Sequence, residues 1–355
     1  MINKFVILGD VHIGVRNSNV QVMEHQLQYY ETQLFPYLEE NNIDIIVQLG
    51  DLFDHRKFQN HFVIHEWKKR FFDYLLKKDI TLITLLGNHD IFYKNTLDVN
   101  STSLLLGEYS NIAIVDKPQD ITIYGTNFSI IPWICESNRE QIEKFVEETE
   151  SIFCFGHFEF AGFEINKGFL ATNGDDPSLY EKFDIVFSGH YHTQGVDKNI
   201  FYVGTPCEYT WIDYNDPKGF HVFDVVNQDV EFIQNNKPLF VKYFYDDQGE
   251  DDSYIDTFDI SLAKNSYVKV VVSHKENIYQ LDKLVNKLLQ QEPIDLKVID
   301  EIDNFDDIEI DENDVEFKDT FDLIKVFIDQ LDTDLDRTRI ETMMKQLYVE
   351  SLEII

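Results

Sequence analysis

The chain has 355 residues, of which 43% are hydrophobic and 14% aromatic, so a wholly disordered protein is excluded. Its formal net charge is −35, which argues against a protein that holds nucleic acid through a broadly basic surface. Three widely spaced cysteines predict a reducing, cytoplasmic setting without disulfides. The apolar run at residues 5–8 is too short for a signal peptide, and no run reaches the ~18 residues of a membrane span.

In the first 240 residues, short apolar runs rich in β-branched residues each end in a polar cluster. The runs are FVIL (5–8), IDIIVQL (43–49), LITLL (82–86), IFCF (152–155) and DIVF (184–187). Continuous apolar runs of this length are typical of strands buried on both faces. Helical stretches are predicted between the first three runs, at roughly 20–41 and 61–78. This alternation predicts a layered α/β domain, which we place at 1–245.

The pattern changes after Gly219. Antiparallel strands are predicted at 220–225, 230–233 and 240–246, followed by a strand at 266–274 and an amphipathic helix at 277–291. We assign 246–300 to a small α+β domain. Residues 295–316 hold eleven acidic residues against one lysine, which is typical of a solvated linker, and the linker proper is placed at 301–316. Two short helices, 317–330 and 336–349, are predicted in the tail 317–355.

The polar clusters at the ends of the predicted strands carry the functional signal. In chain order they contain Asp10 and His12, Asp51 and Asp54, Asn88-His89-Asp90, His157, and His190 and His192. The carboxyl ends of strands in an open α/β sheet are where ligand crevices form. A glycine precedes most of these clusters, and it lets the backbone turn sharply close to an ion or a phosphate.

Carboxylate, amide and imidazole groups together form a mixed oxygen and nitrogen ligand set, and the absence of cysteine from it argues against a structural zinc site. The seven candidate ligands are Asp10, His12, Asp51, Asn88, His157, His190 and His192. That is too many for one ion, whereas two ions about 3.5–4 Å apart, bridged by one carboxylate, would suit phosphoryl hydrolysis. Each motif alone is weak, because a lone Gly-His or Gly-Asp is usually an ordinary loop or turn.

The series DxH, GDxxD, GNHD, GH and GHxH resembles the signature set of calcineurin-like metallophosphoesterases, with all five motifs present in order. The segments GNHDIFYKNT and GTPCEYTWIDYNDPKGFHVFD are similar to the SbcD-type DNA repair nucleases of that superfamily, and within them to the recombination endonuclease subunits of large tailed bacteriophages. The resemblance implies an α/β/β/α sandwich with a small α+β capping domain and a C-terminal helical hairpin.

The resemblance also implies roles for individual residues. It assigns Asp10, His12, Asp51 and His192 to one ion, and Asp51, Asn88, His157 and His190 to the other, with Asp51 bridging them. Manganese is the family's preferred metal and magnesium the alternative. His89 would protonate the leaving oxygen with help from Asp90. Asp54 stands where some members have histidine, which leaves open whether Asp54 or His55 assists His89.

The implied activity is that of a metal-dependent nuclease, a 3′→5′ exonuclease on duplex ends and an endonuclease on single strands. It would act with an SbcC-like ATPase in double-strand-break processing and recombination. Helices at 61–78 and 96–108 would form a homodimer, giving a 2:2 complex. The C-terminal helices would dock on the ATPase, although packing on this chain is equally compatible with their sequence; the residues are Phe321, Ile324, Phe327, Ile328, Met343 and Leu347.

Two alternatives stay open at this point. The same metal ligands would serve a phosphoprotein phosphatase or a cyclic-nucleotide phosphodiesterase of this superfamily, because only the rim of the pocket differs. A non-catalytic scaffold for the ATPase is the other alternative, and such a protein would be expected to have lost ligands. None of the seven is missing here.

Overall fold

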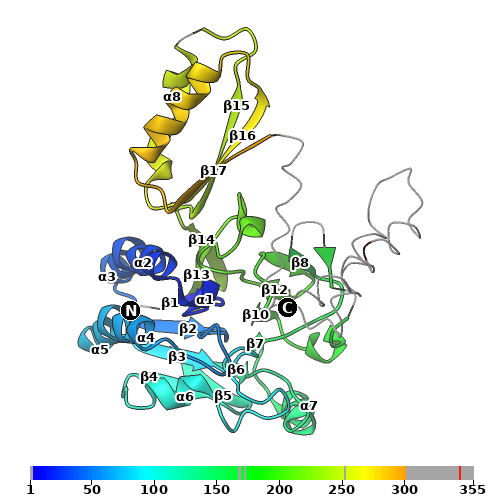
Figure 1. Ribbon diagram of the computed structural model, residues 1–355. Coiled ribbons are helices and arrows are strands. Elements are labelled where there is room, and N and C mark those ends of the chain that lie inside the picture. The colour runs from blue at the N-terminus through cyan, green and yellow to red at the C-terminus, as the bar shows by residue number, and fades with distance from the viewer. Residues whose placement is uncertain (1–2, 167–168, 172, 252, 301–343, 345–355) are drawn as a thin grey trace. The chain divides into compact units, whose positions relative to one another are not determined.

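The structure is a computed structural model, and it describes residues 3–166, 169–171, 173–251, 253–300 and 344 (Figure 1). The predicted acidic linker at 301–316 lies outside this part of the chain. The predicted C-terminal hairpin, apart from Met344, also lies outside the described residues, as do all six residues predicted to bind the ATPase. Residues 3–300 belong to one compact unit.

The first sheet of the layered α/β domain has six strands. In spatial order they are β14 (Asp229–Gln234), β13 (Gly219–Asp224), β1 (Lys4–Leu8), β2 (Ile45–Gln48), β3 (Thr81–Leu85) and β4 (Ile112–Val115). The strands β1 to β4 run parallel, whereas β13 pairs antiparallel with both β1 and β14. The carboxyl ends of β1, β2 and β3 therefore lie at one edge.

The second sheet also has six strands. In spatial order they are β11 (Gly195–Asp197), β12 (Ile200–Tyr202), β10 (Ile185–Gly189), β7 (Phe153–His157), β6 (Thr126–Ile131) and β5 (Gln119–Ile123). The four central strands are parallel to one another, with antiparallel β11 and β5 at the edges. A separate two-stranded ribbon is formed by β8 (Glu164–Asn166) and β9 (Phe169–Leu170).

Helices cover the outer faces of the two sheets. The first sheet packs on two long helical runs, each with a π-helical turn at its middle. One consists of α2 (Val20–Tyr29), η1 (Tyr30–Leu34) and α3 (Phe35–Asn41), the other of α4 (His61–Trp67), η2 (Lys68–Phe72) and α5 (Asp73–Lys77). The second sheet packs on α7 (Arg139–Glu148) and the 3₁₀ turn η3 (Pro177–Tyr180). The shorter helices are α1 (Val15–Ser18) and α6 (Ser101–Leu106).

The alternation of side chains along the strands explains the layers. Phe5 and Ile7 of β1 point into a core shared by the two sheets, whereas Val6 and Leu8 point into the core beneath the first pair of helical runs. Strands buried on both faces need apolar residues at successive positions, which is the pattern of the predicted runs. The predicted α/β/β/α sandwich is thereby confirmed.

The accessory part is a three-stranded parallel sheet with one helix. Its strands, in order, are β15 (Phe240–Asp246), β16 (Tyr267–His274) and β17 (Asp295–Asp300). Between β15 and β16 lie the 3₁₀ turns η5 (Tyr254–Thr257) and η6 (Ile260–Ala263), and α8 (Ile278–Leu289) connects β16 to β17. These turns and α8 pack on one face of the sheet in a separate core.

Two expectations for this region are wrong. The sequence predicts an antiparallel strand at 240–246, but β15 pairs parallel with β16 because the connection between them is long enough to cross over. The first six residues of the acidic stretch 295–316 form β17, which lies within the small domain assigned to 246–300 and before the linker placed at 301–316. The boundary predicted at 245/246 falls inside β15, which belongs to the accessory sheet.

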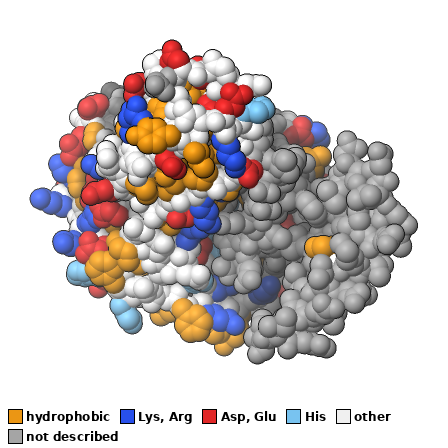
Figure 2. All heavy atoms as spheres, turned by 45° about the horizontal axis from the view of Figure 1, so that its top comes forward, with side chains coloured by type: hydrophobic (Ala, Val, Ile, Leu, Met, Phe, Trp, Pro, Cys, Tyr) orange, Lys and Arg blue, Asp and Glu red, His pale blue; other side chains and the backbone are white. Residues whose placement is uncertain are grey.

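Exposed hydrophobic side chains interrupt the charged surface at several places (Figure 2). Phe58, Phe62 and Leu104 are among the largest. Among the described residues, no helix is long and apolar enough to cross a membrane.

Candidate metal centre

The fold brings five strand ends together. Asp10, Asp51 and Asn88 follow β1, β2 and β3 of the first sheet, while His157 ends β7 and His190 follows β10 of the second sheet. Because the two sheets pack face to face with these ends on the same side, residues up to 182 positions apart meet in one site. The other two predicted ligands, His12 and His192, lie in the loops that follow β1 and β10.

One half of the site contains Asp10, His12 and His192, whose ligand atoms lie close enough to share an ion. His12 Nε2 is 3.1 Å from His192 Nε2, and the Asp10 carboxylate is 4.0 Å from His192 Nε2. The backbone N–H of His190 donates to both Asp10 oxygens, at 3.1 and 3.0 Å. This contact ties the loop after β1 to the loop after β10.

The other half contains Asp51, His157, His190 and Asn88. His157 Nε2 lies 3.3 Å from Asp51 Oδ2 and 2.9 Å from Asn88 Oδ1, and His190 Nδ1 is 3.2 Å from the same Asn88 oxygen. His157 Nδ1 donates to the Leu49 carbonyl at 2.7 Å, which leaves Nε2 to face the other donors. Asp51 is also 4.0 Å from His12 Nε2, so its carboxylate lies between the two halves.

Several of these residues have unusual backbone conformations. His12, Asp51 and His190 have positive φ angles of 49°, 50° and 86°. Such conformations cost free energy for residues with side chains, and they persist where surrounding contacts impose them. Gly50 has φ 91°, and a Cβ there would lie 2.6 Å from His157 Nδ1, so only glycine allows this approach.

The charges of the site favour cations. Asp10 and Asp51 are buried, and within the described residues their ion-pair partners are histidines, without a lysine or arginine. Burial raises the pKa of Asp10, whereas the histidines, led by His157, outweigh burial and hold the pKa of Asp51 well below its usual range. Burial opposes charge on His157, but both carboxylates together raise its pKa to about 9. Burial, reinforced by His157, lowers the pKa of His190 to about 3.

Together these observations fit divalent metal ions. The donors are buried, they converge, and they combine carboxylate, imidazole and amide groups in the manner of a mixed oxygen and nitrogen site. Two buried carboxylates with no lysine or arginine partner among the described residues suit a site that is completed by a cation.

Asp54 and His89 lie beside His12 in the first half. His89 Nδ1 donates to the backbone carbonyl of Asp54 at 2.7 Å, while the Asp54 carboxylate is 3.1 Å from His12 Nδ1 and 3.6 Å from His55 Nε2. The side chain of Asp54 therefore orients His12, and its main chain orients His89. The backbone N–H of His89 donates to Asp51 Oδ1 at 2.7 Å, which holds His89 at the site.

Asp90 supports the backbone of the site. Its buried carboxylate accepts N–H groups from Phe53 at 3.0 Å and Gly87 at 2.9 Å, with a longer contact of 3.4 Å to Leu52. Burial, with Asp51 close by, raises the pKa of Asp90 to about 6. These contacts join the loops after β2 and β3, so Asp90 acts on the position of both loops.

Two further residues, Tyr209 and Lys218, support the site but were missed in the sequence. The Tyr209 hydroxyl lies within hydrogen-bonding distance of the carbonyls of Asp10 and Val11, and Lys218 Nζ donates to the carbonyl of His192. Both belong to a loop without periodicity. The only signal available in the sequence was the resemblance of the segment GTPCEYTWIDYNDPKG as a whole.

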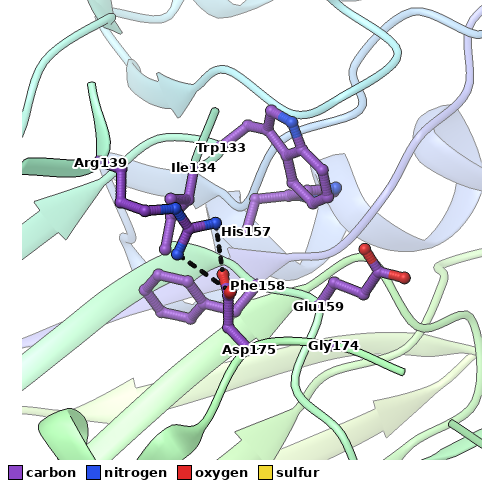
Figure 3. Close-up of a pocket in the computed structure, with 8 residues that line it drawn as sticks. All are labelled: Trp133, Ile134, Arg139, His157, Phe158, Glu159, Gly174 and Asp175. Atoms are coloured by element: carbon purple, nitrogen blue, oxygen red, sulfur yellow. Dashed lines mark hydrogen bonds and ion pairs between the residues drawn. The ribbon is translucent and has the colours of Figure 1, made fainter. Parts of the chain in front are cut away.

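A cavity of about 320 Å³ adjoins the second half (Figure 3). The Trp133 ring lies 5.8 Å from His157 and 5.2 Å from His190, measured between ring centroids. Arg139 forms a bidentate ion pair with Asp175 on the wall of the cavity, at 3.0 and 3.3 Å. The cavity thus opens beside His157, one of the candidate ligands.

Comparison with known proteins agrees with this geometry. Residues 3–194 match the family model of the calcineurin-like phosphoesterases. The chain is 33% identical over 354 residues to exonuclease subunit 1 of Enterobacteria phage T4, covering 99% of this chain and all of the relative. It is 24% identical to the SbcD subunit of the nuclease SbcCD from Staphylococcus epidermidis, over 66% of this chain and 70% of that one. It is 26% identical to the DNA double-strand break repair protein Mre11 of Sulfurisphaera tokodaii, over 53% of this chain and 49% of that one.

The family match covers more than half of the chain and includes every strand end that contributes to the centre. The full-length similarity to the phage relative extends the relationship through the accessory part. This chain therefore belongs to the calcineurin-like phosphoesterase family.

Proposed function

We propose that the protein is a metal-dependent DNA nuclease that acts in recombination and double-strand-break repair. The observation that carries the proposal is the buried centre, in which seven donors from five strand ends meet and the described partners of Asp10 and Asp51 include no lysine or arginine. The relatives named for nuclease activity and break repair support DNA as the substrate. We propose 3′→5′ exonuclease activity on duplex ends and endonuclease activity on single strands.

Two divalent ions would be held as the resemblance implies. Asp10, His12 and His192 would bind one ion, Asn88, His157 and His190 the other, and Asp51 would bridge them; the contacts of Asp51 with both His12 and His157 support this role. When bound, the ions supply a water of lowered pKa and stabilise charge on the phosphoryl oxygens. We propose manganese as the metal, with magnesium as the alternative.

His89 is proposed to protonate the departing 3′-oxygen. Its Nδ1 is committed to the Asp54 carbonyl, so Nε2 is the nitrogen that would exchange a proton with the substrate. The His12 and His89 ring centroids are 4.9 Å apart, which places this proton donor beside the first half of the site. We propose that Asp54 and Asp90 position the loops and rings around it.

The proposals for partners and assembly rest on the similarity to SbcD and Mre11. We propose that an SbcC-like ATPase binds the protein through the C-terminal helices, that two copies form a homodimer within a 2:2 complex, and that the complex works in the cytoplasm, of the host cell if phage-encoded. Exposed Phe58, Phe62 and Leu104 lie in or beside 61–78 and 96–108 and support a dimer face there, because burying large apolar side chains favours association.

The function is tested with a His89→Ala variant. Manganese, an end-labelled duplex, a single-stranded circle and a small aryl phosphodiester should be supplied separately to the wild-type protein and the variant. We expect the wild type to cut both DNAs, and the variant to lose about 10²–10⁴-fold in rate while its manganese and DNA binding change little. Lys144→Ala, a substitution of a 72% exposed residue on α7 outside the proposed dimer face, is the control and should cut at the wild-type rate.

The other outcomes separate the alternatives. Cleavage of the aryl ester without cleavage of either DNA would contradict the nuclease proposal and favour a phosphodiesterase or phosphatase of the same superfamily. No cleavage of any substrate by the manganese-loaded wild type would favour the scaffold. A His89→Ala variant that cuts at the wild-type rate would remove His89 from the mechanism and leave the rest intact.

A further inference from the structure

The loop between β12 and β13, residues 203–218, is called the support segment here. It contains the 3₁₀ turn η4 (Trp211–Asp213) and passes behind one half of the metal centre. None of its residues is among the seven predicted ligands, so the proposed function leaves its contacts unexplained.

The support segment holds the main chain of the first half of the centre. Lys218 Nζ donates to the carbonyl of His192 at 2.9 Å, and the backbone N–H of Thr205 donates to the same oxygen at 3.1 Å. The Tyr209 hydroxyl is 2.8 Å from the Asp10 carbonyl and 2.9 Å from the Val11 carbonyl. The Tyr209 ring also packs edge-on against His12 and His192, with centroids 5.5 and 5.9 Å away.

A buried charge cluster fixes these two donors. Lys218 is 3% exposed, and its Nζ lies 2.8 Å from both Asp213 Oδ1 and Asp216 Oδ2. The second oxygen of Asp213 accepts the backbone N–H groups of Tyr209 and Thr210, at 2.8 and 2.9 Å. One carboxylate thus joins the lysine that holds His192 to the tyrosine that holds Asp10.

The second half of the centre is held differently. His157 is fixed by the carbonyl of Leu49, and His157 and His190 share the Asn88 oxygen. These contacts come from the ends of β2, β3, β7 and β10, at a distance in the chain from the support segment. The two halves are joined where the His190 N–H donates to Asp10 and where the Asp51 carbonyl accepts the N–H groups of Val11 and His12. Within the described residues, however, the side chains of Lys218 and Tyr209 contact the main chain of the first half only.

We propose that Lys218 and Tyr209 are positioning residues for the Asp10–His12–His192 half alone, so that the support segment sets the affinity of one of the two ions. This inference rests on the proposed two-ion centre. Partners that orient metal ligands from outside the coordination shell typically contribute 10–100-fold in affinity. Lys218 and Tyr209 bind the main-chain carbonyls of ligand residues, and they thereby fix the backbone positions of Asp10 and His192.

The test is a calorimetric titration of manganese into the metal-free, full-length protein, with free manganese followed by electron paramagnetic resonance. We expect the wild type to bind two ions. Lys218→Met should weaken one ion about 10–100-fold and leave the other within about twofold. Lys218→Arg, which keeps the charge, should recover part of the loss. The control is Lys182→Met, because Lys182 also donates to backbone carbonyls, those of Val146 and Thr149, at the end of α7.

Removing Lys218 leaves two buried carboxylates unpaired, so Lys218→Met can fail to fold. Tyr209→Phe then decides, since it keeps the ring and removes only the hydroxyl. We expect it to weaken the same ion about 3–10-fold, the effect of losing one hydrogen bond. Unchanged affinity for both ions in Tyr209→Phe and Lys218→Arg, or equal weakening of both ions, would overturn the proposal. A wild type that binds fewer than two ions would instead refute the two-ion centre of the proposed function.

Discussion

His221 is a buried histidine whose ring nitrogens have no hydrogen-bond partner among the described residues. It lies on β13, between the rings of Phe201 and Phe232, whose centroids are 5.1 and 5.0 Å away. Burial lowers its pKa to about 4. The folded protein thus binds this proton more weakly than the unfolded chain, and acid favours unfolding.

The expected consequence is a pH-dependent loss of stability. Above about pH 6.5 the group is neutral in both states and contributes no pH dependence; as the pH falls towards 4, the unfolded chain takes up the proton first. At pH 5 the penalty is about 2 kcal/mol. His221→Phe keeps an aromatic ring but has no group to protonate. Between pH 7.5 and 5 we expect its free energy of unfolding to fall by about 2 kcal/mol less than that of the wild type. Urea unfolding at both pH values measures it.

His65→Gln is the control for this prediction. The His65 side chain is 70% exposed on α4, so its replacement should leave the pH dependence as in the wild type. Equal losses of stability in His221→Phe and the wild type would show that His221 is not the responsible group.

The site residues that could be predicted are those marked by their local sequence, as polar residues directly after an apolar strand. Each candidate ligand follows a buried strand, and the parallel pairing of the strands then brings the ligands together, as at Asp10 and His190. The roles of Asp54 and Asp90 were not predictable, because a carboxylate near a strand end does not reveal whether it meets an imidazole or a backbone N–H. The role of Lys218 could not be predicted, because its contacts with Asp213 and the His192 carbonyl depend on the conformation of a loop that has no periodic sequence pattern.

At the scale of elements, the accessory sheet carries a row of lysines. Lys242, Lys269 and Lys297 are neighbours across β15, β16 and β17, on the face opposite α8. Like charges opposite each other normally destabilise a sheet. Two of them have aromatic neighbours, since Lys269 Nζ lies 4.3 Å from the Trp211 ring and Lys242 Nζ lies 4.9 Å from the Tyr214 ring. Lys269 is only 7% exposed, whereas Lys242 is half-buried and Lys297 is exposed, so these two are the members of the row that can meet a phosphate backbone.

We expect this row to contribute to DNA binding. Lys297→Ala should weaken binding about equally for all sequences and lower the slope of log affinity against log salt by about 1, and Lys242→Ala combined with it by about 2. Fluorescence anisotropy with a short duplex at several salt concentrations measures both. Lys275→Ala is the control, because Lys275 is already paired with Asp300 at 2.9 Å. An unchanged slope in the double variant would place DNA elsewhere.

The elements themselves were predictable to different degrees. The runs at 20–41 and 61–78 are helical as expected, since their apolar spacing follows the helical repeat. Their π-helical turns, η1 and η2, leave no comparable pattern. The direction of β15 was predicted incorrectly because a strand looks the same in either direction, and pairing depends on how far the following connection reaches.

The net charge of −35 does not exclude DNA as a substrate of this protein. A chain this acidic would repel DNA on average, but contact is decided locally. Bound cations at Asp10 and Asp51 and the lysine row would provide two places where phosphates are attracted. The acidic remainder of the surface would repel nucleic acid, and the proposed ATPase partner would have to supply further contacts to DNA.

The predicted homodimer can be tested at three exposed apolar side chains. Phe58, Phe62 and Leu104 are 78%, 52% and 76% exposed, and solvated side chains of this size are favourable to bury in an interface. We expect the wild type to have twice the 41.9 kDa mass of one chain by light scattering, and Phe62→Glu with Leu104→Glu to have that of a monomer, because burying two carboxylates costs more than the interface gains. Val226→Glu, at a 68% exposed position in the turn between β13 and β14, should leave the dimer intact. A dimer that survives the double substitution would move the interface away from 61–78 and 96–108.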